Sequence, residues 1–406
     1  MDFLSDPISF LGSLLVNLLL GWGLAPAFAT AIVKFLGSGA LGTFCLVFVI
    51  FTIWLERKVY ARIQDRLGPN RIGPWGILQT IPDMIKIFTK EFITPQGADT
   101  VVYNLAPIMA VGAVILIWAV IPLAPTVVGT EVNVGVLYIV AVGAIGTLSL
   151  IMAGWSSNNK YALLGAFRAV AQMVSFEVPM IIALLIPVIL SGSMGVNTIV
   201  NAQGIWYVIL APVAALLFFI TSQAEIGRAP FDLLEAESEI VAGYQTEYSG
   251  IKFGMFYVGE FLHAFTISAL TTALFLGGWR GWGAEQSALI GFFWFFLKSF
   301  IVYFFVLVLR ISMPRLRIDQ MLNFNWKFLT PLALILLMVT ALVEKLITEL
   351  VLPGFSAGAG SWVRTIIHLG VNLIFVWVTL TILRRSERKM RQPIAEPRPV
   401  AMAPKS

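Results

Sequence analysis

An acidic stretch, Gln223 to Gly250, interrupts an otherwise apolar chain and carries the residues best suited to proton chemistry. It holds six of the chain's 22 carboxylic acids and a single base, Arg228. Because apolar sequence flanks it on both sides, like charges here are costly unless protons, cations or hydrogen bonds offset them, and neighbouring acids raise each other's pKa. Carboxyls that titrate near neutrality are what a proton path requires. The six acids are Glu225, Asp232, Glu235, Glu237, Glu239 and Glu247.

The spacing of these acids suits a helix that begins at Pro230, a residue tolerated in a first helical turn. In such a helix Asp232, Glu235 and Glu239 share one face, and Glu237 points elsewhere. Acids in the first turn complement the helix dipole, which is a structural explanation for Asp232 and Glu235. The dipole does not explain the acids further along. An acidic face that is merely solvated is the alternative for the whole stretch.

Three more ionisable residues lie inside apolar runs. Glu177 stands two residues before Pro179. An intramembrane carboxylate is a functional candidate, and the alternative is a protonated glutamate bonded to a carbonyl that the proline leaves free. Glu260 and His263 are three residues apart, so on a helix they share a face and could relay a proton. A simple hydrogen-bonded pair is the alternative for these two.

Composition places these residues in a membrane protein. Mean hydropathy is +0.88 and 12% of residues are charged, against roughly 25% in soluble domains. Runs of about 20 apolar residues recur, each long enough to cross a bilayer. The sequence predicts an all-α, polytopic protein with about nine transmembrane helices. They fall near 35–55, 101–124, 133–154, 171–191, 205–224, 251–276, 288–311, 329–350 and 362–383.

The chain lacks the ligands for a redox centre of its own. It has one cysteine and two histidines, whereas a cysteine-ligated iron–sulfur cluster needs about four thiolates and a bis-histidine haem needs a facing pair. We therefore expect no cofactor and no metal in this chain. Any redox centre would lie in a partner.

The basic residues predict the orientation. Of the 27 lysines and arginines, 22 lie in 56–100, 155–170, 225–254, 310–328 and 384–406. Nine spans put all these segments on one side, which the positive-inside rule makes cytoplasmic. The N-terminus is then outside and the C-terminus inside. We expect three segments: an apolar segment at 1–34, one transmembrane domain at 35–383, and a basic, proline-rich tail at 384–406. The first segment is either interfacial or contains an extra span at 8–24. The transmembrane domain has cytoplasmic loops at 56–100, 155–170, 225–250 and 312–328.

The first cytoplasmic segment joins a basic stripe to an amphipathic helix. Arg57, Lys58, Arg62 and Arg66 recur at helical spacing, and apolar residues from Trp75 onward repeat with a helical period that indicates a helix on the membrane surface. Membrane anchoring alone would explain this pattern. The sharper hypothesis is a vestibule for an amphipathic, lipid-soluble substrate, because arginine binds oxygens at two points.

Four long motifs resemble one family. They are ERKVYARIQDRLGPNRIGPWGILQ, GWSSNNKYALLGAFRAVAQMVSFE, RAPFDLLEAESEIVAGYQTEYSGIKF and PRLRIDQMLNFNWKFLTP. In this order they resemble the quinone-site membrane subunit, the H subunit, of respiratory complex I, the proton-pumping NADH:quinone oxidoreductase. The resemblance covers roughly residues 31–385. The chain departs from the usual family pattern at Pro82, at Ile226-Gly227, where Thr-Asn is common, and at Leu234.

The resemblance implies a bacterial plasma-membrane subunit of an enzyme complex, with quinone as substrate and with FMN and iron–sulfur clusters in partner subunits of the peripheral arm. Small membrane-arm subunits and the lipid bilayer are further partners, and nucleic acid is not. Quinone access is implied for Arg57 and Arg66, and a place in the chamber loop for Phe231 and Asp232. Proton coupling is implied for Glu177, Glu225, Glu235, Glu237, Glu239, Glu247 and Glu260.

Two other functions are compatible with the pattern. One is the homologous membrane subunit of an energy-converting hydrogenase, which uses no quinone. The basic stripe from Arg57 to Arg66 and the complete RAPFD motif favour the quinone enzyme. The other is a free-standing ion transporter, against which the large polar segments on a single side argue, because they indicate a docked partner.

Overall fold

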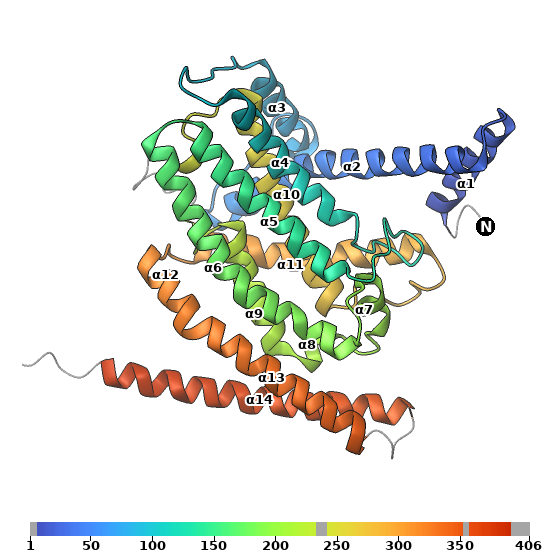
Figure 1. Cartoon of the computed structure of the whole chain (residues 1–406), viewed down its shortest axis with the longest axis vertical. Helices are drawn as coiled ribbons and strands as arrows, with labels where there is room; N and C mark the ends of the chain where they lie inside the picture. The colour runs from blue at the N-terminus through green and yellow to red at the C-terminus, as the bar shows by residue number, and fades with distance from the viewer. Residues whose placement is uncertain (1–5, 233–241, 352–356, 391–406) are drawn as a thin grey trace, which may run out of the picture.

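The computed structural model describes residues 6–232, 242–351 and 357–390, and every regular element in these ranges is a helix (Figure 1). Eight helical stretches there are long and apolar enough to cross a membrane, which confirms the all-α polytopic architecture. They are α2 (Pro26–Ile63), α4 (Thr100–Trp118), α5 (Gly135–Ser156), α6 (Lys160–Ser191), α10 (Gly250–Phe275), α11 (Ala288–Ser312), the stretch Ile318–Leu350 with α12 (Ile318–Phe324) and α13 (Thr330–Leu346), and α14 (Ala357–Met390).

The segment expected as a span at 205–224 is divided into α8 (Tyr207–Leu210) and α9 (Pro212–Ile226). Ala211 has non-helical dihedral angles, and Pro212 begins the second helix. The two helices α8 and α9 nevertheless connect two separate parts of the molecule. Arg280, beyond the end of α10, donates to the carbonyl of Gln203 at 2.8 Å, whereas Gln172 in the first half of α6 donates to the carbonyl of Ala224 at 2.6 Å.

Helix α2 is much longer than the expected span at 35–55. It runs for 38 residues from Pro26, and no proline interrupts the chain before Pro69. The expected loop 56–100 therefore begins as helix, and Arg57 lies on it. The first part of α2 leaves the body of the molecule (Figure 1), and α1 (Pro7–Gly21) packs beside it. Because α1 has 15 residues, about 22 Å of helix, it is shorter than a bilayer core.

A proline inside α6 explains how α13 is attached. Pro179 has no N–H, so the carbonyl of Ser175 lacks its helical donor. The side-chain amide of Asn325 donates to that carbonyl at 2.6 Å. Asn325 begins a π-helical turn, Asn325–Leu329, directly before α13. Asn325 therefore donates to the carbonyl of Ser175 that the proline leaves free. The alternative explanation of Glu177, a protonated carboxyl bonded to this carbonyl, does not apply.

The far end of α10, the helix that carries Glu260 and His263, is fixed by a buried lysine. Lys298 of α11 is 6% exposed. Its ammonium donates to the carbonyls of Leu276 at 2.8 Å, Gly278 at 3.1 Å and Arg280 at 2.6 Å. These contacts use all three donors of the ammonium group. The last turn of α10 and the loop after it are thus held against α11.

Candidate functional site

An apolar groove of about 320 Å³ lies between α2, α3 (Thr80–Thr89) and α10. Its walls are mostly aliphatic and aromatic, and they include Leu46, Ile50, Met84, Ile87, Phe253 and Phe261. Its polar lining is concentrated at Glu56, Arg57, Tyr60 and Asp83. Arg57 forms an ion pair with Asp83 of α3 and remains 45% exposed. The groove therefore offers an apolar bed with a charged end, a shape that suits an amphipathic molecule.

Glu56 anchors a buried ion cluster at the charged end of the groove. It is 4% exposed and accepts from Arg228 at 3.1 Å, from Arg310 of α11, and from the hydroxyl of Tyr303 at 3.3 Å. A buried carboxylate is tolerated when it is paired and hydrogen-bonded in this way. Glu56 was expected at the start of a cytoplasmic loop, and its place inside the molecule was not predicted.

Arg228 joins two carboxylates in this cluster. Its side chain is 1% exposed, and it donates to Glu56 at 3.1 Å and to Glu260 at 3.0 Å. Its guanidinium also lies over the ring of Phe261, 4.8 Å from the centroid. Burial lowers the pKa of Arg228, but the two carboxylates outweigh that effect and raise its pKa above the ordinary value. The guanidinium therefore stays charged.

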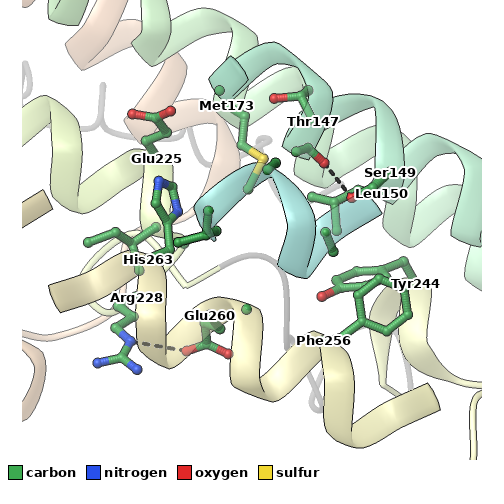
Figure 2. Close-up of a pocket in the computed structure, with 18 of the residues that line it drawn as sticks. Thr147, Ser149, Leu150, Met173, Glu225, Arg228, Tyr244, Phe256, Glu260 and His263 are labelled. Carbon is green, nitrogen blue, oxygen red and sulfur yellow. Dashed lines mark hydrogen bonds and ion pairs between the residues drawn. The ribbon is translucent and has the colours of Figure 1, made fainter. Parts of the chain in front are cut away.

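A cavity of about 90 Å³ lies on the other side of the cluster (Figure 2). Arg228, Glu260 and Arg310 form its charged wall, and Glu225, Asp232 and His263 line it as well. The opposite wall is mainly apolar and aromatic and includes Leu150, Met173, Tyr244 and Phe256. A cavity of this size and polarity has room for several water molecules. The ion cluster thus lies between the groove and a cavity that is charged on one wall and apolar on the other.

A second cavity, of about 20 Å³, continues from the first toward α6. Glu177 lines it, and Glu225, His263, Ile117 and Gly143 line both cavities. It has room for about one water molecule. Carboxyl groups thus follow one another from Glu260 through Glu225 to Glu177 along two adjoining cavities.

The upstream end of the acidic stretch is tied to α6. The side-chain amide of Gln172, which is fully buried, donates to the carbonyls of Ala224 and Phe231, both at 2.6 Å. Phe231 is 4% exposed and packs against Phe176 with ring centroids 5.2 Å apart. Glu225 directly follows the first of these carbonyl groups, and Asp232 directly follows the second. The two hydrogen bonds therefore hold both acids in place at the cavity.

The downstream end is tied to α4 by two tyrosines. The rings of Tyr103 and Tyr248 stack with centroids 4.1 Å apart. Pro107 leaves the carbonyl of Tyr103 without its helical donor, and the hydroxyl of Tyr248 donates to it at 3.2 Å. The hydroxyl of Tyr103 donates in return to the carbonyl of Glu247 at 2.7 Å. Residues 242–249 are therefore a fixed part of the site.

The close approach of this segment to α6 requires a glycine. A Cβ on Gly165 would lie 2.6 to 2.8 Å from backbone atoms of Gly243 and Tyr244. The carboxylate of Glu247 accepts from Asn159, the residue that caps α6, at 2.6 Å. Glu247 is thus bonded at the end of α6 and is not among the residues that line either cavity.

The structure brings together only part of the expected site. Glu225, Asp232 and Glu260 line the first cavity, Glu177 lines the second, and Arg57 lines the groove. Arg66 is exposed in the turn after α2, where it donates to Gln64 at 2.8 Å. Phe231 packs in the core next to the cavity. Glu235, Glu237 and Glu239, with Leu234, lie outside the described residues.

Comparison with known proteins places the chain in a family. A family model described as NADH dehydrogenase matches residues 38–341. The NADH-quinone oxidoreductase H subunit of Dehalococcoides mccartyi (strain CBDB1) is 45% identical, over 82% of this chain and 91% of the relative. The protein of the same description from Geobacillus sp. (strain WCH70) is 44% identical, over 78% of this chain and 96% of the relative. The NADH-quinone oxidoreductase H 2 subunit of Geobacter sulfurreducens is 45% identical, over 73% of this chain and 92% of the relative. The chain therefore belongs to the family of H subunits of NADH-quinone oxidoreductases, as a multi-pass membrane component of that enzyme complex.

Proposed function

We propose that the groove receives the quinone from the membrane and that this chain couples quinone reduction to proton translocation. The observation that carries this proposal is the ion cluster of Glu56, Arg228, Arg310 and Glu260, because Glu56 lines the groove, and Arg228, Glu260 and Arg310 form the charged wall of the first cavity. The apolar wall suits an isoprenoid tail, and Arg57 beside Glu56 suits a headgroup oxygen.

The cluster supplies a physical route for the coupling. Reduction of a quinone to a quinol consumes two electrons and two protons, and in this proposal the electrons come from FMN and iron–sulfur clusters of partner subunits. A change of charge or hydrogen bonding at Glu56 alters how strongly Arg228 binds Glu260, since one guanidinium pairs with both carboxylates. Glu260 faces the cavity, so the change reaches the water and the carboxyl groups there.

The orientation and the partners follow the charge distribution. We place the basic face in the cytoplasm of a bacterium, with the N-terminus outside and the C-terminus inside, and dock the peripheral-arm subunits on that face. The family membership argues against the other function considered, the membrane subunit of an energy-converting hydrogenase. The apolar groove ending at Arg57 also supports the quinone enzyme, because its shape fits an apolar tail with a polar headgroup.

The replacement Arg57→Ala tests this function in the assembled complex. We expect slower quinone reduction and a higher KM for quinone, because the charged end of the groove loses its donor. Electron input from NADH to a water-soluble artificial acceptor should not change. The matched control is Arg71→Ala, which removes an exposed base outside the groove. Normal quinone KM and turnover in the assembled Arg57→Ala complex would rule out quinone binding at this end of the groove.

A further inference from the structure

His263 occupies a position that the sequence pattern alone does not explain. It lies on α10, one turn after Glu260, and it lines both cavities. Among the described ionisable residues, Glu225 is the other one that lines both. Figure 2 shows the imidazole of His263 between the carboxylate of Glu225 and the ion pair of Arg228 with Glu260.

The simple pairing of Glu260 with His263 does not occur. The carboxylate of Glu260 accepts from Arg228 at 3.0 Å. Within the described residues His263 has no ion pair and no hydrogen bond to Glu225, and both side chains line the two cavities. An imidazole that borders two water-sized spaces can take a proton on one ring nitrogen and release a proton from the other.

We propose that His263 relays protons between the two cavities, exchanging them with Glu225 through cavity water. This inference rests on the proposed function and adds a residue to it. In each transfer a proton from water or a carboxyl group on one side binds one nitrogen, and the proton on the other nitrogen passes to the far side. The ring is then neutral again but carries its proton on the opposite nitrogen, and it returns to its starting tautomer by rotation or by a second proton exchange.

The surroundings of His263 suit this role. In the part of the chain that the structure describes, the titratable and charged groups that line the cavities with it are Glu177 of α6, Glu225 of α9, Glu260 of α10, Arg310 of α11, Arg228 and Asp232 of the loop after α9, and Tyr244. The two arginines are engaged by Glu56 and Glu260. The carboxyl groups of Glu225 and Glu177 are therefore the acceptors and donors available on the α6 and α9 side of the imidazole.

The test replaces His263 in the assembled complex by a side chain that holds water but takes up no proton in the working pH range. For His263→Asn we expect quinone reduction coupled to proton translocation to fall about tenfold or more. Electron input to a water-soluble acceptor should be unchanged. The pH profile of the coupled reaction should also change, because proton exchange through the imidazole is lost. His263→Phe, which excludes water as well, should be at least as slow.

The second histidine supplies the matched control. His368 of α14 is 1% exposed, and its imidazole lies 2.9 Å from Glu344, away from both cavities. His368→Asn should leave the pH profile unchanged. A wild-type pH profile and coupled rate in His263→Asn would overturn the relay. That result differs from failure of the proposed function, in which the wild-type complex itself would not reduce quinone.

Discussion

At the scale of single residues, Arg228 is the base that pairs with two carboxylates of the buried cluster. Its one guanidinium compensates Glu56 and Glu260, and it is almost completely shielded from solvent. Removing one partner of a buried pair costs about 3–5 kcal/mol, because the other charge is left uncompensated. We therefore expect Arg228→Met to lower the stability of the assembled complex by roughly that amount. Arg228→Lys should recover only part of it, since a lysine lacks the planar fork.

The measurement is heat inactivation of the purified complex, with Arg57→Met as a comparison. The ion pair of Arg57 with Asp83 is partly exposed, with side chains 45% and 30% accessible. Exposed pairs contribute about 0–1 kcal/mol. Equal losses in Arg57→Met and Arg228→Met would contradict the interpretation of Arg228 as the support of a buried cluster.

Individual residues also mark the limits of sequence-based prediction. Glu225 and Asp232 were predicted because acids at a membrane edge stand out against apolar sequence, and Glu260 because it lies inside an apolar run. Glu56 was not, because it stands at the end of an apolar run beside bases, where a surface position is the ordinary expectation. Its burial depends on Arg310, which is 254 residues away. Such a pairing has no local signal.

The departure from the family pattern at Ile226-Gly227 has a local explanation. Gly227 ends α9 with left-handed dihedral angles, φ 73° and ψ 25°. Asparagine, which is common in the family at this position, is the other residue that tolerates this conformation. The exchange therefore preserves the end of the helix. The departure at Leu234 lies outside the described residues.

At the scale of elements, the proline in α6 and the amide before α13 form one unit. Asn325→Leu should destabilise the complex by about 1–3 kcal/mol, because it leaves the buried carbonyl of Ser175 without a donor. Pro179→Ala restores the helical N–H to that carbonyl. In a double-mutant cycle, Asn325→Leu should therefore cost less in the Pro179→Ala background. Additive effects on the heat-inactivation midpoint would show that the two residues act independently.

The lengths of the elements were less predictable than their positions. Hydropathy locates apolar runs, so the spans near 101–124, 133–154, 251–276 and 288–311 correspond closely to α4, α5, α10 and α11. Hydropathy does not report where a helix ends. Helix α2 passes through Glu56, Arg57 and Lys58 because glutamate, arginine and lysine are good helix formers, and it ends at Ile63, a few residues before Gly68 and Pro69. The break at Ala211 likewise follows from Pro212 and not from polarity.

At the scale of the whole molecule, the orientation depends on whether the divided pair α8 and α9 crosses the membrane. If it does, the loop between α10 and α11 lies outside, opposite the turn after α2. If it does not, α10 runs in the other direction and that loop lies in the cytoplasm. The bond from Arg280 to Gln203 and the bond from Gln172 to Ala224 place the two ends of the pair apart and favour a crossing.

The chain is well suited to a direct test of this topology. Its one cysteine, Cys45, is buried, so Cys45→Ala gives a cysteine-free background. Trp282, which is 94% exposed, and Arg71, which is also exposed, lie in the two loops in question. In intact cells a membrane-impermeant maleimide should label Trp282→Cys at once and Arg71→Cys only after the membrane is opened. Labelling of both only after opening would mean that α8 and α9 do not cross, and the assignment of the basic face as the single cytoplasmic face would fail with it.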